Sequence, residues 1–395
     1  MQLGKKGLLL LIILLSTFAP FSTDMFLAGL PDMVVYFDTN EQIMSMTLYG
    51  FMLSLAISIL IIGPISDKYG RRKVLIASLL IYIAMTMACS FSTSIWMLIL
   101  FRVLQAVGAG GAMAISVALI KDCFIGKDMS FALSATAVLG VLGPVLAPVI
   151  GTALLEVAGW ESTFWATAVL AGICLVMSLF ISSTIPEERY DGTIIGSLAN
   201  LTVLLRNRDF TKFTVMMSIF TVALLGYVGV SSYIYQEQFG VSSVEYSGFL
   251  AATVLLGVAG MLILQKLNPR FGSRWMLKVF LVLTTVSAVL MFTVGQIGTF
   301  AFMAAMLPIS IIAPTVRSYG FEILMNQYNE NAGSVSSILN FSTFAFGCIG
   351  MVIASIQFTD SFVISVGICV LIALAVFVVL LADMYKNGTT IKELN

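Results

Sequence analysis

Apolar residues gather into long, nearly uninterrupted segments that short polar stretches separate. A helix needs about 20 such residues to cross the roughly 30 Å hydrocarbon layer of a membrane. Backbone groups in lipid must pair within their own segment, so we predict helices rather than strands. The twelve predicted spans, each bounded to within a few residues, are 7–29, 42–65, 74–91, 95–119, 130–155, 162–184, 211–234, 245–267, 275–295, 298–322, 331–356 and 359–382.

The longest polar stretch, residues 185–210, lies in the middle of the chain. We therefore predict an N-terminal six-helix bundle over 1–184, a cytoplasmic central loop over 185–210 and a C-terminal six-helix bundle over 211–395. The segment Asp67–Leu75 returns in weakened form as Pro269–Leu277, at the corresponding place in the second half. Parallel repeats of this kind occur in transporters whose substrate site lies between the halves. The predicted fold is all-α, in the membrane, with two pseudo-symmetric bundles.

The charges sort by side. If loops alternate from a cytoplasmic N-terminus, eighteen of the twenty Lys and Arg residues fall on the cytoplasmic side, and the outer loops carry acids instead. Lys and Arg accumulate in cytoplasmic loops, so both termini are predicted to be cytoplasmic in a multi-pass protein of the cell membrane. The apolar run 7–21 is predicted to be a permanent first helix rather than a signal peptide, because no A-x-A-like cleavage site follows it.

Composition excludes several classes of protein. The chain is 59% hydrophobic and only 10% charged, outside the range of soluble domains. Its zero net charge, without a basic run, gives no reason to expect a nucleic-acid partner. The absence of histidine excludes a histidine relay or a His-ligated metal, and the five scattered cysteines form no CxxC pair. We expect no metal and no cofactor; the expected partners are a small-molecule substrate, protons and membrane lipid, with the protein acting as a monomer.

Four motifs carry a resemblance to the major facilitator superfamily. The loop Gly63–Lys73 resembles the family's helix 2–3 signature, and Arg102–Gly110 resembles its helix 4 motif. The segment Gly140–Gly151 resembles the helix 5 motif of antiporters. Ser22–Leu27, followed by Leu30 and Pro31, resembles the drug:proton antiporters of the bicyclomycin and chloramphenicol resistance branch.

The resemblance implies a non-enzymatic, proton-coupled antiporter that exports small amphiphilic molecules by alternating access. It implies a gate at the helix 2–3 loop, formed by Gly63, Asp67, Gly70, Arg71 and Arg72; otherwise these charges are only a positive-inside anchor. It also implies an antiporter motif of Gly140, Gly143, Pro144, Pro148 and Gly151, although glycine and proline are common in membrane helices in general.

Charged residues inside a predicted span are costly and indicate function. Asp24 and Arg102 lie at similar depth in the outer halves of the first and fourth spans, and we predict that they carry proton coupling. Asp24 could instead be hydrated among the headgroups. Arg102 could instead anchor carbonyls of neighbouring helices, with Gln105 on the same helical face.

The predicted substrate cavity contains Asp24, Arg102, Gln105, Tyr227 and Arg317. Arg317 in the tenth span either contacts substrate or snorkels to the interface, and Glu322 is expected at the cytoplasmic interface. Tyr227 and the abundant methionines would suit a lipophilic pocket, but tyrosines near a helix end also fit an interfacial belt.

Other functions remain open at this point. An exporter of an endogenous anionic or zwitterionic metabolite, such as a metallophore, would suit two intramembrane arginines. A nutrient symporter could use the same fold. An intramembrane enzyme would need a nucleophile with its base or a metal cluster, and no dense polar cluster is visible in the spans. A sensor or scaffold would need an output domain, and none is visible.

Overall fold

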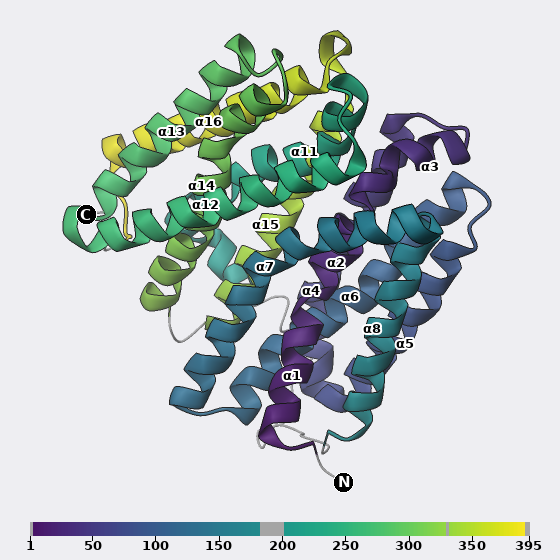
Figure 1. Ribbon diagram of the computed structural model, residues 1–395. Helices are drawn as coiled ribbons and strands as arrows, with labels where there is room; N and C mark the ends of the chain where they lie inside the picture. Colours follow the sequence, from purple (N-terminus) through teal and green to yellow (C-terminus); the bar gives the residue numbers. More distant parts are fainter. Residues whose placement is uncertain (1–2, 182–200, 329–331, 392–395) are drawn as a thin grey trace. The chain divides into compact units, whose positions relative to one another are not determined.

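The computed structural model describes residues 3–181, 201–328 and 332–391, and every regular element within these ranges is helical (Figure 1). The chain divides into two compact units, Met1–Leu198 and Ala199–Asn395. Of the predicted central loop 185–210, residues 185–200 lie outside the described ranges, and residues 201–206 and 208–210 are helical.

The first unit holds the predicted spans one to six. Its first span is not one continuous helix: it breaks at Thr17 and again at Met25 and Phe26. The elements are α1 Lys5–Ser16, α2 Phe18–Asp24, the 3-10 turn η1 Leu27–Gly29, α3 Leu30–Tyr36, α4 Glu41–Tyr69, α5 Arg71–Ser90, α6 Ile95–Cys123, α7 Lys127–Ala158 and α8 Glu161–Leu179.

Helix α6 packs tightly against α4 and α5 because glycines line its contact faces. A Cβ added to Gly108 would lie 2.5 Å from the carbonyl oxygen of Ser78 on α5, and one added to Gly110 would lie 2.6 Å from Cβ of Ser58 on α4. Small residues allow helix backbones to approach closely in membranes. Arg102 and Gln105, on this same helix, are therefore surrounded by neighbouring helices.

The second unit follows the same plan. Its seventh span ends in a π-helical turn, a feature that often accompanies functional sites. The elements are α10 Arg208–Ser218, α11 Phe220–Ser232, the π-helix η2 Tyr233–Gln238, α12 Ser243–Phe271, α13 Ser273–Thr293, α14 Thr299–Gln327, α15 Ala332–Ser355, the 3-10 turn η4 Phe358–Asp360 and α16 Phe362–Asn387.

The sequence repeat returns as a repeat of structure. Helices α4 and α12 both have 29 residues, and each ends at a single glycine from which the next helix starts. These glycines, Gly70 and Gly272, have φ of 94° and 79°, a conformation that other residues adopt only at a cost. Helices α6 and α14 also share a length of 29 residues.

Eleven helical stretches of the described residues are long and apolar enough to cross a membrane. The predicted fifth span appears by this measure only as the shorter apolar stretch Leu142–Ala158 of α7. However, α7 has 32 residues, which at 1.5 Å per residue is about 48 Å and exceeds the hydrocarbon thickness. The predicted all-α membrane fold is confirmed, with α7 as the twelfth candidate span.

Several contacts identify one end of the first unit, which we call its basic end. Lys5 forms an ion pair with Asp128 at the start of α7, at 3.1 Å. The Arg72 guanidinium donates to the carbonyl oxygen of Leu179 at 2.6 Å. The N-terminus, the start of α5, the start of α7 and the end of α8 therefore lie together, as an alternating series of spans requires.

Candidate functional site

Asp24 lies where the first span breaks. It is the last residue of α2, only 9% exposed, and its Oδ1 accepts a hydrogen bond from the Thr23 hydroxyl at 2.8 Å. Met25 and Phe26 keep right-handed helical dihedrals, but the regular α-helical segment is interrupted there before η1 begins. A break in a membrane helix frees backbone polar groups, which transporters use at binding sites.

The antiporter-like motif of α7 packs onto this break. A Cβ added to Gly151 would lie 1.8 Å from the carbonyl oxygen of Met25, and one added to Gly143 would lie 2.8 Å from Cγ of Pro20. Both glycines therefore hold α7 against the segment that carries Asp24. Pro144 and Pro148 lie inside the same helix; Gly140 also belongs to it, but its surroundings are outside the described residues.

Arg102 lies fully buried inside the first unit. Its Nη1 donates to the carbonyl oxygen of Ser22 at 2.7 Å and to Oε1 of Gln105 at 2.8 Å. Gln105 in turn donates from Nε2 to the Thr86 hydroxyl on α5 at 2.7 Å. This chain of hydrogen bonds links the first, third and fourth spans.

Three aromatic rings surround the Arg102 guanidinium. Its Cζ lies 4.3 Å from the ring centroid of Phe51, 4.5 Å from that of Phe26 and 5.9 Å from that of Phe164. Nε and Nη2 have no hydrogen-bond partner. The negative faces of aromatic rings attract cations, so these rings offset part of the cost of the buried charge.

Asp24 and Arg102 form no ion pair within 4.0 Å in this structure. The guanidinium instead bonds the backbone of Ser22, two residues before Asp24. The sequence left two roles open for Arg102, anchoring of backbone carbonyls and direct coupling to Asp24. The bond to the Ser22 carbonyl is of the anchoring kind. The two residues are still joined through one short segment of the first span.

A small cavity of about 10 Å³ lies beside this segment, roughly the room that one water molecule needs. Its lining includes Ser22, whose hydroxyl shares a 2.6 Å hydrogen bond with the Tyr82 hydroxyl. The lining residues are Phe21, Ser22, Met25, Phe26, Gln105, Thr163, Phe164 and Thr167. Polar groups from three spans therefore meet next to the break.

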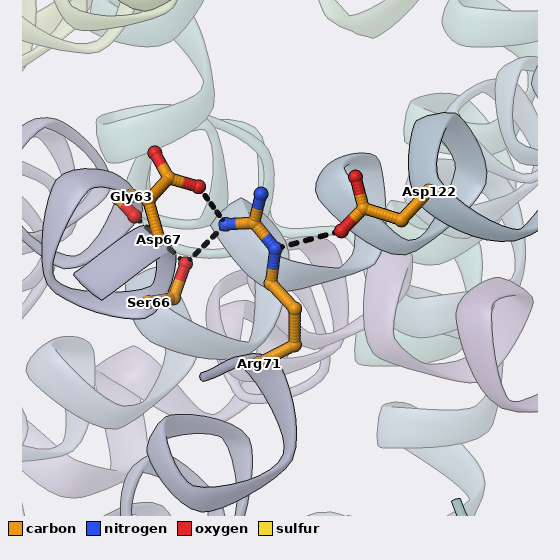
Figure 2. A network of polar contacts seen from close by, with 5 residues as sticks. All are labelled: Gly63, Ser66, Asp67, Arg71 and Asp122. Carbon is orange, nitrogen blue, oxygen red and sulfur yellow. Dashed lines mark hydrogen bonds and ion pairs between the residues drawn. The ribbon is translucent and has the colours of Figure 1, made fainter. Parts of the chain in front are cut away.

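A second charged group lies at the basic end, where three of the five predicted gate residues, Gly63, Asp67 and Arg71, belong to one network of polar contacts (Figure 2). Arg71 is ion-paired with Asp67, donates from Nη1 to the Ser66 hydroxyl at 2.6 Å and donates from Nε to Asp122 at 2.9 Å. The Ser66 hydroxyl donates to the Gly63 carbonyl at 2.7 Å. Arg71 is 8% exposed and thus joins α4, α5 and α6.

Asp122 was not predicted as a site residue. In sequence it stands among charges at the end of the fourth span, beside Lys121, and looks like any other interfacial residue. Only the fold brings it to Arg71, 51 positions away. Phe51, Thr86 and Tyr82 around Arg102 and Ser22 were missed for the same reason, since apolar and hydroxyl side chains carry no distinctive signal in a span.

The predicted site residues of the second unit are not assembled in the same way. Arg317 is exposed, and its Nη2 donates to Oδ1 of Asn340 on α15 at 3.2 Å. Glu322 is also exposed. Tyr227 is only 1% exposed and packs against Phe302, with ring centroids 5.6 Å apart, so it presents no accessible surface in this conformation.

The chain belongs to the Major Facilitator Superfamily, whose family model matches residues 12–351. It is similar to the uncharacterized MFS-type transporter YdgK of Bacillus subtilis, at 26% identity over 88% of both chains. The multidrug resistance protein MdtL of Escherichia coli is 26% identical over 59% of each chain. The efflux pump radE of Floropilus chiversii is 30% identical over 49% of this chain and 35% of its own.

Solved structures show the same fold at low sequence identity. A peptide transporter POT in complex with sulfate gives a TM-score of 0.75, at 15% identity over 97% of this chain and 95% of that one. A D-xylose-proton symporter gives a TM-score of 0.74, at 14% identity over 96% of this chain and 97% of that one. The protein is therefore a multi-pass membrane transporter of this superfamily, with relatives named for multidrug resistance and efflux.

Proposed function

We propose that the protein is a proton-coupled antiporter that exports small amphiphilic molecules across the cell membrane, with both termini in the cytoplasm. One observation carries the proposal: a buried carboxylate, Asp24, stands at a break in the first span with a hydroxyl partner and no ion pair. Intramembrane acids of this kind mark proton and substrate pathways.

The coupling step is a proton transfer between Asp24 and water. Burial penalises the charged form of a carboxyl group, so Asp24 releases its proton only when its side of the break becomes hydrated. Arg102 holds the neighbouring Ser22 carbonyl and keeps the break in place. One proton moving down 100 mV supplies about 2.3 kcal/mol, enough to bias a conformational cycle.

In this proposal the Arg71 network is the gate. Arg71 binds carboxylates on both α4 and α6, and breaking these contacts would let the helix ends separate. In many conformational switches, ion pairs of this kind are formed in one state of the protein and broken or exchanged in the other. The same charges also fit the cytoplasmic side by the positive-inside rule.

The name of MdtL, a multidrug resistance protein, favours a drug as the substrate, and that of radE, an efflux pump, favours export. Arg317 favours a second candidate, an anionic or zwitterionic cellular metabolite, because this cationic residue is exposed within a span. Arg102 adds nothing to that candidate in this conformation, because it is fully buried. A compound-resistance panel and metabolite profiling of the medium, in cells with and without the protein, distinguish the two.

The replacement Asp24→Asn tests the proton assignment directly. It keeps the shape and the hydrogen bond from Thr23 but removes the titrating group. We expect substrate-induced proton movement in everted vesicles to fall to background while expression stays normal. Asp32→Asn, at an exposed acid of α3, is the matched control and should retain transport. Full proton coupling in the Asp24 variant would refute the assignment.

A further inference from the structure

A second cavity lies in the second unit, between α13 and α16, away from the residues discussed so far. Its volume is about 30 Å³, room for about two water molecules or groups of similar size. The lining residues are Arg274, Leu277, Leu381, Met384, Tyr385 and Thr389. Leu277, Leu381 and Met384 are buried and form an apolar floor, whereas Arg274 and Tyr385 are exposed.

The polar side chains of this cavity can all donate hydrogen bonds, and phosphate oxygens accept such bonds. Arg274 offers a planar guanidinium, which binds phosphate oxygens in a bidentate manner. Tyr385 and Thr389 add hydroxyls. Lys278 follows Arg274 by one helical turn, and Lys386 follows Tyr385 directly; both are exposed. Two described acids lie nearby, Asp383, which is paired with Lys212, and Asp209. The basic side chains Arg274, Lys278, Lys386 and Lys212 outnumber them.

The C-terminal tail completes the cavity and is itself fixed in place. The backbone N–H of Thr390 donates to Asp209 at 2.8 Å, and the Thr390 carbonyl accepts from Gln327 at 3.0 Å. Ile391 is fully buried. Both backbone groups of Thr390 are therefore hydrogen-bonded, and this holds the preceding residue, Thr389, at the cavity.

The surroundings match the boundary between lipid and water. Phe271 is 58% exposed and stacks on Trp275, with centroids 4.9 Å apart; aromatic residues gather at that boundary. Helix α13 also begins here without a side-chain cap, so its positive end adds to the local charge. A donor set above an apolar floor suits a molecule with a phosphate and an acyl chain.

We propose that this cavity binds the headgroup of an anionic phospholipid from the adjoining membrane leaflet. The phosphate contacts Arg274, Tyr385 and Thr389 above the apolar floor of Leu277, Leu381 and Met384, and the rest of the lipid extends out of the cavity. The bound lipid ties the start of α13 to the end of α16. The proposal is independent of what the protein transports and of the role of Asp24.

Native mass spectrometry of the purified full-length protein tests the site. The protein is titrated separately with phosphatidylglycerol, phosphatidylcholine and inorganic phosphate. We expect phosphatidylglycerol to bind in preference to phosphatidylcholine and to stay bound in excess phosphate. Arg274→Gln should weaken phosphatidylglycerol binding about fivefold, the effect of one cation near a membrane surface, and Tyr385→Phe should weaken it less.

The control variant is Arg270→Gln, which removes another exposed positive charge, from the end of α12, at a residue that does not line the cavity. Its phosphatidylglycerol affinity should match that of the unmodified protein. An equal loss in both arginine variants would overturn the proposal in favour of a diffuse basic surface. Equal binding of the two lipids would overturn it as well, and displacement by inorganic phosphate would identify a free-anion site instead.

Discussion

At the scale of single residues, the flat shape of the Arg102 guanidinium is as important for stabilising its buried charge as the hydrogen bonds that it donates. A guanidinium is flat, so it can lie over Phe26 and Phe51 while Nη1 still reaches the Ser22 carbonyl and Gln105. A lysine ammonium is compact and strongly hydrated and cannot do both. The position therefore requires arginine in particular rather than positive charge in general.

We expect Arg102→Lys to destabilise the protein by about 1.5–3 kcal/mol, the usual value of one hydrogen bond to a charged group. The thermal unfolding midpoint of the purified protein in detergent measures the change. Arg206→Lys, at an exposed position in the helical stretch 201–206, is the control and should have no effect. An unchanged midpoint for Arg102→Lys would mean that the rings and the carbonyl contribute nothing.

Arg71 differs from Arg102 because it binds two carboxylates at the edge of the unit. We expect Asp122→Asn and Arg71→Gln to be non-additive in a double-mutant cycle of stability, with a coupling energy above about 1 kcal/mol. The exposed pair Lys5 and Asp128, whose side chains are 76% and 59% exposed, serves as the control cycle. Its coupling should stay below about 0.5 kcal/mol, and equal couplings would argue against a special role for Arg71.

Sequence alone could identify Asp24, Arg102 and Arg71, because a charge in or beside an apolar span is conspicuous. It could not identify their partners. Phe51 and Asp122 come from other helices, and nothing in their local sequence distinguishes them from lipid-facing or interfacial residues. It also could not exclude an Asp24–Arg102 pair, since similar depth in two spans does not fix which atoms the guanidinium reaches.

At the scale of elements, α7 depends on glycine for its contact with the broken first span. We expect Gly151→Ala to destabilise the protein by about 1–3 kcal/mol, the usual cost of overpacking, because the added Cβ would lie 1.8 Å from the Met25 carbonyl oxygen. Gly172→Ala in α8, where no atom lies within 4 Å, should be neutral. Thermal unfolding of both variants measures this, and equal midpoints would contradict the packing.

The helices themselves could largely be predicted, because apolar length and flanking charge decide where a chain crosses a membrane. Their interruptions were not predicted. The break at Thr17 has a local cause, because Pro20 has no N–H to donate to the Ser16 carbonyl and its ring clashes with that carbonyl. The break at Met25 and the π-helical turn Tyr233–Gln238 contain neither glycine nor proline. Close contacts, such as Gly151 on Met25, accompany the break at Met25, and such contacts have no local sequence pattern.

At the scale of the whole molecule, the span count depends on α7. Within the described part of the chain, eleven stretches qualify by apolar length alone, and α7 enters only through Leu142–Ala158. An odd count would place the two ends of the chain on opposite sides and would break the sorting of Lys and Arg. The length of α7 and the joint position of Lys5 and Asp128 at one end of the unit both fit a helix that crosses.

Cysteine labelling across α7 tests this count. Ile125 lies just before the helix and Val157 lies in its last turn. They are 89% and 86% exposed, so a cysteine at either position is reachable. In a background without the five native cysteines, we expect an impermeant maleimide to label Val157→Cys in intact cells and Ile125→Cys only after permeabilisation. Ile297→Cys, 76% exposed before α14, should behave like Val157→Cys. Labelling of both flanks of α7 from one side would show that this helix does not cross, because one crossing must separate its two ends.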